Sequence, residues 1–62
     1  MSYVLYETED GAYYGGINPK YTDIFNYTVK ECAKELIEND ALRIRDILNK
    51  AGYSFVLKEV NQ

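Results

Sequence analysis

Histidine is absent from this 62-residue sequence, and cysteine occurs once, as Cys32. One cysteine cannot form an intrachain disulfide, and a chain without histidine lacks the usual ligand sets of structural zinc sites. The same absence excludes histidine-based catalytic arrangements. The carboxylates, which could bind a hard cation if they were clustered, are dispersed along the sequence. We therefore expect no enzymatic activity, no cofactor and no metal site.

Long hydrophobic runs are absent too. No stretch of about 18 apolar residues is present, so the sequence predicts no transmembrane helix. The first residues lack the charged and apolar regions of a secretory signal. A lone thiol without such a signal is typical of a reducing compartment, and the expected location is the cytoplasm.

The length of the chain limits the core that it can build. We expect one domain, residues 1–62. Domains of this size bury only about 60% of the surface that the unfolded chain exposes, so their stability is marginal. They usually need a very regular core, a covalent staple or a partner, which makes a homodimer one expectation.

Positive charge is scarce in the first part of the chain. Residues 1–27 carry four acids and one lysine, a net charge of −3, whereas residues 28–62 carry six acids and six bases. Six of the seven tyrosines also lie in residues 1–27. Direct nucleic-acid binding needs a basic face, so this distribution disfavours it. A protein partner with a basic surface is a better match for an acidic, tyrosine-rich surface.

An Asp-Gly pair, Asp10-Gly11, lies between two β-prone runs, Tyr3–Thr8 and Ala12–Ile17. Both residues of the pair tolerate the positive φ of a two-residue hairpin turn, so the pattern predicts an antiparallel hairpin. A two-residue turn would place Tyr6 opposite Gly15. This hairpin is the element around which we expect the sheet to form.

The alternation of side chains divides the hairpin into two faces. One face would carry Tyr3, Leu5, Glu7, Tyr14 and Gly16, and the other Val4, Tyr6, Thr8, Tyr13 and Ile17. We expect Val4, Tyr6 and Ile17 to face the core, because the alternative places Glu7 directly across from Tyr14. The adjacent glycines at positions 15 and 16 permit a β-bulge or a register slip.

The segment Lys20–Tyr27 follows a turn signal at Asn18-Pro19 and allows two structures. One is a helix that starts at Ile24, and the other is a loop that places Ile24 and Phe25 in the core.

Residues Thr28–Leu36 have helical spacing and begin with a capping-box pattern. The apolar stripe consists of Val29, Cys32, Ala33 and Leu36. This stripe predicts a helix with a buried, structural Cys32 thiol. The alternative is a single helical turn followed by an extended Ala33–Ile37.

A second helix is predicted from Asn39, a good N-cap residue, to Gly52, which suits the left-handed position after a helix. Its apolar stripe contains Ala41, Leu42, Ile44, Ile47, Leu48 and Ala51. The run Tyr53–Val60 then predicts the last strand. The predicted order is β-β-α-α-β, an α+β fold with a three-stranded sheet covered on one face by helices, in which the last strand pairs parallel to the first.

Four motifs carry a resemblance to a known group of proteins. They are Y-V-L-Y with D-G-A-Y-Y-G-G in the hairpin, Y-T-D at Tyr21–Asp23, A-L-R-I-R-D-I-L at Ala41–Leu48 and F-V-L-K-E-V at Phe55–Val60. With them the chain resembles small uncharacterised α+β proteins encoded by phages and prophages of Gram-positive bacteria. The resemblance implies an intracellular accessory protein that binds host machinery, including defence nucleases. It implies no functional residues, and it favours an extended Ala33–Ile37.

The hairpin is the expected working surface, because its charge and tyrosine content exceed what folding requires. The candidate contact residues are Tyr3, Glu7, Glu9, Asp10, Tyr13 and Tyr14. The expected function is stoichiometric binding to a host protein by a phage-type accessory protein that inhibits a defence nuclease system of the CRISPR or restriction type. The alternative is a homo-oligomeric structural or scaffolding module.

Overall fold

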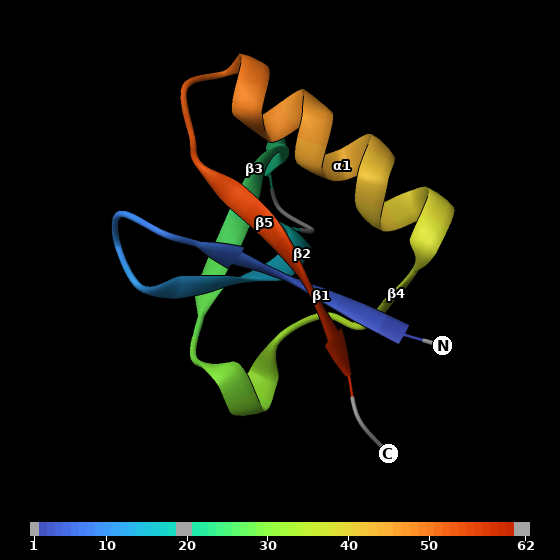
Figure 1. Ribbon diagram of the computed structural model, residues 1–62. Coiled ribbons are helices and arrows are strands. Elements are labelled where there is room, and N and C mark those ends of the chain that lie inside the picture. Colours follow the sequence, from blue (N-terminus) through green and yellow to red (C-terminus); the bar gives the residue numbers. More distant parts are fainter. Residues whose placement is uncertain (1, 19–20, 61–62) are drawn as a thin grey trace.

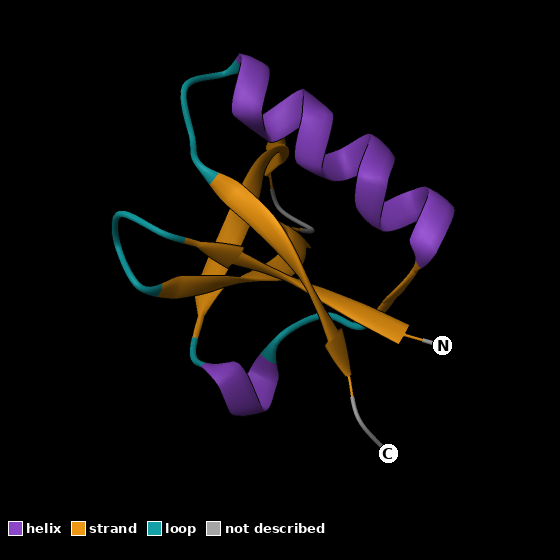
Figure 2. Cartoon of the chain, in the orientation of Figure 1, coloured by secondary structure: helices purple, strands orange, loops and turns teal. Residues whose placement is uncertain are grey.

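An antiparallel sheet with a helix on one face organises the chain, as Figures 1 and 2 show. The computed structural model describes the backbone of residues 2–18 and 21–60 and the side chains of residues 2–16 and 28–60. The elements are β1 (Ser2–Glu7), β2 (Ala12–Asn18), β3 (Tyr21–Thr28), a 3₁₀ turn η1 (Lys30–Cys32), β4 (Leu36–Ile37), α1 (Glu38–Lys50) and β5 (Phe55–Val60). The α+β class predicted from the sequence is therefore confirmed. The predicted three-stranded sheet in the order β-β-α-α-β is wrong, because residues 21–28 add strand β3, residues 36–37 add β4, and α1 is the one α-helix in the described part of the chain.

Strand β1 lies at the centre of the sheet. One of its edges pairs with β5 over its whole length, from Ser2 opposite Val60 to Glu7 opposite Phe55. The other edge is shared by β2 and the short β4, and β3 pairs with β2. All of these pairings are antiparallel.

The last strand thus pairs with the first, as predicted, but the predicted parallel direction is wrong. Two successive helices would have brought the chain back to the Ser2 end of β1 before the last strand. One helix instead leaves the chain at the Glu7 end of β1. Helix α1 has 13 residues and spans about 20 Å, which matches the length of the six-residue β1. It carries the chain from β4, beside Ser2, to β5, which begins beside Glu7. Strand β5 must therefore run antiparallel to β1.

The turn between β1 and β2 is wider than predicted. Tyr6 lies opposite Tyr13 and Glu7 opposite Ala12, so residues 8–11 form a four-residue loop. The two-residue turn that would place Tyr6 opposite Gly15 is wrong. Because the register moves by two residues, each side chain keeps its predicted companions on its face of the sheet.

The core lies between α1 and the face of the sheet that carries Leu5. Its buried members are Leu5, Tyr14, Ala41, Leu48 and Phe55, with Tyr3, Leu36, Ile44 and Leu57 packed against them. The prediction that Val4 and Tyr6 face this core is wrong, and the side chain of Ile17 lies outside the described residues. The physical reason is that β5 adds Leu57 beside Leu5 on the opposite face.

Residues 28–37 are mostly extended rather than helical. The predicted helix Thr28–Leu36 is wrong, since only Lys30–Cys32 forms a 3₁₀ turn. The N–H of Lys34 donates to the carbonyl of Tyr14 at 2.9 Å, a bond across the molecule that replaces an intrahelical one. The alternative of one turn followed by an extended segment is confirmed in outline. The predicted burial of Cys32 is wrong, because its thiol is exposed.

Residues 21–28 form strand β3, so both structures considered for this segment are wrong. The side chains of Ile24 and Phe25, and Pro19 of the predicted turn, lie outside the described residues. The β2–β3 ladder shifts register between Tyr14 and Ile17, at the glycine pair for which the sequence permits a bulge or a register slip. Gly16 has a φ of 96°, a conformation that favours glycine.

Helix α1 begins directly after β4. Ile37 occupies the N-cap position and no side chain caps the helix, so the prediction of an Asn39 cap is wrong. Asp40 lies in the first turn, and its carboxylate pairs with Arg43 at 3.2 Å. At the other end, Gly52 has a φ of 106° beyond the C-cap residue, as predicted.

Candidate functional site

The buried carboxylate of Glu7 holds the loop between β1 and β2. Its side chain is only 1% exposed. One oxygen accepts the N–H of Glu9 at 2.7 Å, and the other accepts the N–H of Ser54 in the loop before β5. These bonds, that of Ser54 first, lower the pKa of the Glu7 carboxyl, although burial acts in the opposite direction. Glu7 is therefore placed to stay ionised inside the fold.

Further bonds hold the loops at residues 8–11 and 51–54 side by side. The N–H and the hydroxyl of Thr8 both donate to the carbonyl of Ser54, at 3.0 and 3.2 Å. Within the hairpin loop, the N–H of Gly11 donates to the carbonyl of Glu7 at 2.9 Å, and the φ of Gly11 is 70°. The conformation of the hairpin loop is thus fixed by bonds to the neighbouring loop and by a bond within the hairpin itself.

This framework presents two exposed acids, Glu9 and Asp10, which we call the acidic tip. The neighbouring loop adds Tyr53, which is 38% exposed and whose ring lies 6.1 Å from that of Phe55. Exposed carboxylates suit contact with a basic protein surface, and an exposed tyrosine in the neighbouring loop adds rigid contact area.

The six predicted contact residues do not form one exposed face. Glu9 and Asp10 are exposed. The other four are at least half-buried: Tyr3, Glu7, Tyr13 and Tyr14. Glu7, Tyr13 and Tyr14 are buried and therefore do not form part of an exposed contact surface.

The tyrosines of the covered face illustrate this structural role. The hydroxyl of Tyr3 donates to the Glu38 carboxylate at 3.4 Å, and the charge of Glu38 raises the pKa of that hydroxyl. Burial raises the pKa of Tyr14. Tyr53, in contrast, belongs to the exposed surface but was predicted within the last strand. Gly52 directly before it was the available signal, since a helix-ending glycine indicates a loop.

The face of the sheet that α1 does not cover has its own aromatic cluster. The rings of Tyr6 and Tyr13 lie 5.0 Å apart, and the ammonium of Lys58 lies 4.1 Å from the centre of the Tyr6 ring. A pocket of about 330 Å³ opens beside them. It is lined by Val4, Tyr13, Lys30, Glu31, Ala33, Glu35, Lys58, Glu59 and Val60. Its charged side chains are exposed and of both signs.

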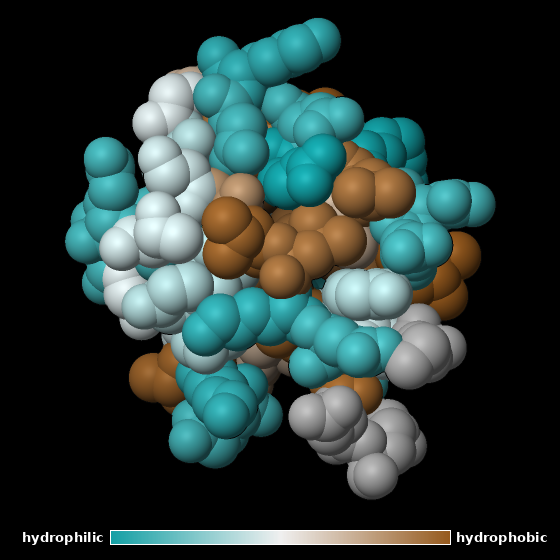
Figure 3. All heavy atoms as spheres, in the orientation of Figure 1, coloured by the Kyte–Doolittle hydropathy of each residue, from teal (hydrophilic) through white to brown (hydrophobic). Residues whose placement is uncertain are grey.

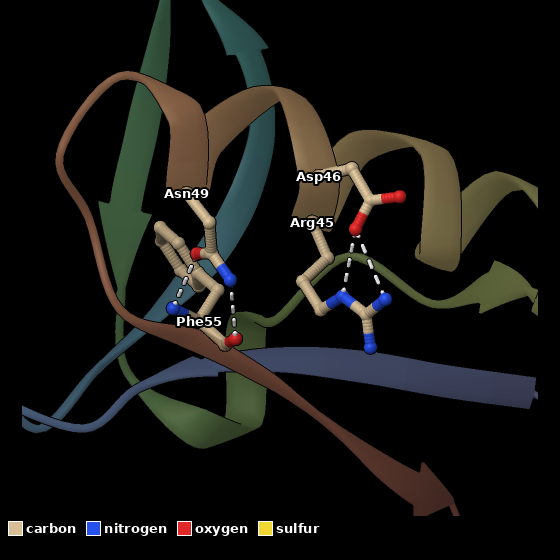
Figure 4. Close-up of polar contacts among 4 residues, drawn as sticks. All are labelled: Arg45, Asp46, Asn49 and Phe55. Atoms are coloured by element: carbon tan, nitrogen blue, oxygen red, sulfur yellow. Dashed lines mark hydrogen bonds and ion pairs between the residues drawn. The ribbon is translucent and has the colours of Figure 1, made fainter.

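The end of α1 is tied to the start of β5 by one side chain, as Figure 4 shows. The amide oxygen of Asn49 accepts the N–H of Phe55 at 2.8 Å, and the amide nitrogen donates to the Phe55 carbonyl at 3.2 Å. We call this pair of bonds the Asn49 clamp. One helical turn earlier, the guanidinium of Arg45 pairs with Asp46 at 3.0 Å.

Figure 3 shows the face that carries β5, where hydrophilic side chains surround a hydrophobic patch near the centre. Among the described residues, no group of three or more acidic, cysteine or histidine side chains is placed to hold a metal ion. No helix in the described part of the chain has the length and apolar character needed to cross a membrane.

No protein-family model, curated protein or solved structure matches this chain. Its function must therefore be inferred from its own surface.

Proposed function

We propose that this chain is a non-enzymatic protein that binds one partner stoichiometrically through its acidic tip, and that the partner presents a basic surface. The observation that carries the proposal is the use of the buried Glu7 carboxylate to fix a loop that exposes Glu9 and Asp10.

A hairpin does not need this arrangement in order to fold. The Asp10-Gly11 pair suits a two-residue turn, yet the chain forms a wider loop held by a buried carboxylate. Burial of a carboxylate is unfavourable unless hydrogen bonds compensate for the lost water. The bonds from Glu9 and Ser54 do so, and they also order the exposed acids before any partner arrives. Such preorganisation reduces the entropy lost on binding.

The partner that we propose is a nuclease of a bacterial defence system, of the CRISPR or restriction type, met in the cytoplasm of the host. A nuclease has a basic cleft that binds phosphates, and exposed carboxylates compete for the same cations. The net charge of −3 in residues 1–27 and the resemblance to phage-encoded accessory proteins support this class of partner.

Affinity capture from a bacterial lysate tests the proposal. The native chain is compared with Glu9→Lys plus Asp10→Lys, and with Glu31→Lys plus Glu35→Lys, which changes the net charge equally at other exposed acids. The native chain and the control should capture the same protein, and the tip variant should lose it. Equal capture by the tip variant would remove the acidic tip as the binding site.

A second candidate function is a homo-oligomeric scaffolding module. Three large hydrophobic side chains favour it, since each is more than half exposed: Val29 at 62%, Ile37 at 62% and Ile47 at 58%. Burying such side chains against a second copy would stabilise a small domain. Sedimentation equilibrium should then show a mass that rises with concentration, and a constant monomer mass at tens of micromolar would exclude the module.

A further inference from the structure

We infer that the outer edge of β5 binds an extended segment of a different protein as an added antiparallel strand, with a basic residue opposite Glu59 and an acidic residue opposite Lys58. Lys58 and Glu59 lie near the Val60 end of β5, whereas the hairpin loop that carries the acidic tip is bonded to Ser54, beside the Phe55 end. The inference is therefore independent of the proposed function.

Strand β5 has one paired edge and one open edge. It pairs with β1 alone in the part of the chain that the structure describes. The Asn49 clamp binds both backbone groups of Phe55, so these groups point away from β1. Only the first residue of the open edge is occupied in this way.

Hydrogen-bonding direction alternates along an antiparallel strand. Since the groups of Phe55 point outward, those of Leu57 and Glu59 point outward as well. The groups of Val56 and Lys58 point toward β1. The open edge therefore offers two N–H donors and two carbonyl acceptors, which is the pattern that an added strand recognises.

A second copy of this chain does not fit the edge well. Two antiparallel β5 strands would attract each other if Lys58 of one strand lay opposite Glu59 of the other. This pairing is impossible, because an outward-pointing residue such as Glu59 faces only another outward-pointing residue, and Lys58 points toward β1.

Each of the remaining self-pairing registers has a defect. If Leu57 faces Glu59 of the copy, Lys58 faces Lys58. If Glu59 faces Glu59, the like charges meet directly. The other registers place Phe55 opposite Phe55, Leu57 or Glu59 of the copy, and each of them needs backbone groups of Phe55 that the Asn49 clamp already holds. Edges protected in this manner are a known device against self-association.

A different segment avoids all three defects. Its basic residue faces Glu59 on the face covered by α1, and the next residue, an acid, faces Lys58 on the uncovered face. Directly opposed side chains have Cβ atoms about 5 Å apart, so both pairs lie within reach of an ionic contact. The motif required of the partner is therefore base then acid, flanked by β-prone residues.

Two capped synthetic hexapeptides test the inference on the native protein. One is Thr-Val-Arg-Glu-Val-Thr, and the other, Thr-Val-Glu-Arg-Val-Thr, has the charges reversed. Binding is followed through the amide NMR signals of Leu57 and Glu59 at low salt. The first peptide should bind more tightly, on the order of tenfold, because two attractive pairs replace two repulsive ones.

The double variant Lys58→Glu plus Glu59→Lys keeps the composition and should invert the preference. Leu57→Pro removes an outward N–H and no N–H of the β1–β5 ladder, and should weaken binding of the first peptide. Leu57→Ala is its control, since it loses the packing of Leu57 against the core but keeps the N–H, and it should bind this peptide as the native chain does. Failure of both peptides to shift these signals at millimolar concentration would overturn the inference. So would equal binding of the two peptides, or self-association of the native chain that Leu57→Pro abolishes.

Discussion

The Asn49 clamp allows a quantitative test of how α1 is joined to the sheet. Asn49→Ala removes the two hydrogen bonds to Phe55 while leaving the helix backbone unchanged. We expect the variant to fold and to be less stable than the native chain.

The expected loss follows from two opposing effects. Each hydrogen bond contributes roughly 1 kcal/mol net, so the clamp is worth about 2 kcal/mol. Alanine is a better helix former than asparagine by up to about 0.7 kcal/mol, which offsets part of this loss. The free energy of unfolding should therefore fall by about 1.3 kcal/mol. For a domain of this size each kcal/mol lowers Tm by roughly 4–8 °C, so the expected decrease is roughly 5–10 °C.

Urea unfolding followed by circular dichroism measures the effect. The matched control is Lys50→Ala, the next residue of α1, which should change stability little. Asn49→Asp keeps the acceptor for the Phe55 N–H and loses the donor, so it should fall between Asn49→Ala and the native chain. A variant Asn49→Ala as stable as the native chain, or a control that loses as much, would refute the assignment of stability to the clamp.

Three further predictions concern Glu7, Phe55 and Cys32. The pKa of Glu7 is lowered in the folded state, so its contribution to stability is complete above its ordinary pKa of 4.5 and is lost as the pH falls through the folded-state value. Glu7→Gln should therefore flatten the acid limb of a plot of urea midpoint against pH, and an unchanged acid limb would contradict the role given to this carboxylate. Phe55→Ala should lower the unfolding free energy by about 3–5 kcal/mol, because it empties a fully buried site, and a loss below about 1 kcal/mol in urea unfolding would show that the site is not part of the core. The exposed Cys32 should react with a thiol reagent equally fast in native buffer and in urea, whereas strong protection in native buffer would place it inside the fold.

Local signals in the sequence predicted the elements whose stability is local. The Asp10-Gly11 pair marked a hairpin, and Gly52 marked the end of α1, because positive φ is favourable at few residue types. The α+β class follows from these elements. The register of the hairpin did not follow, because the Glu7 carboxylate competes with the turn preference by binding the N–H of Glu9.

Long-range contacts explain the remaining errors. The carboxylate of Glu7 led to the prediction that its face of the hairpin is exposed. The hydrogen bond from Ser54 that allows its burial could not be predicted, because Ser54 lies 47 positions away in the sequence. The helical periodicity of Thr28–Leu36 was overridden by the bond from Lys34 to Tyr14 on β2. Neither hydrogen bond can be predicted from the residues that flank its two partners in the sequence.

The candidate site was predicted in part. The charge count identified the region of Glu9 and Asp10, which are exposed at its tip. It could not separate the tyrosines needed by the core from those on the surface, because tyrosine serves both environments. Tyr53 was missed because its loop is joined to the hairpin loop by the bonds from Thr8 to Ser54, which are long-range in the sequence.

The Asn49 clamp also has an evolutionary consequence. By occupying Phe55 it blocks the self-pairing registers of β5 that bring no like charges together. Loss of this single amide would open those registers and turn an edge suited to a foreign strand into one that also accepts its own copy. The choice between a heteromeric and a homomeric assembly would then depend on Asn49, which lies in α1 and outside the contacting strand β5. A single substitution at this position could change the quaternary structure.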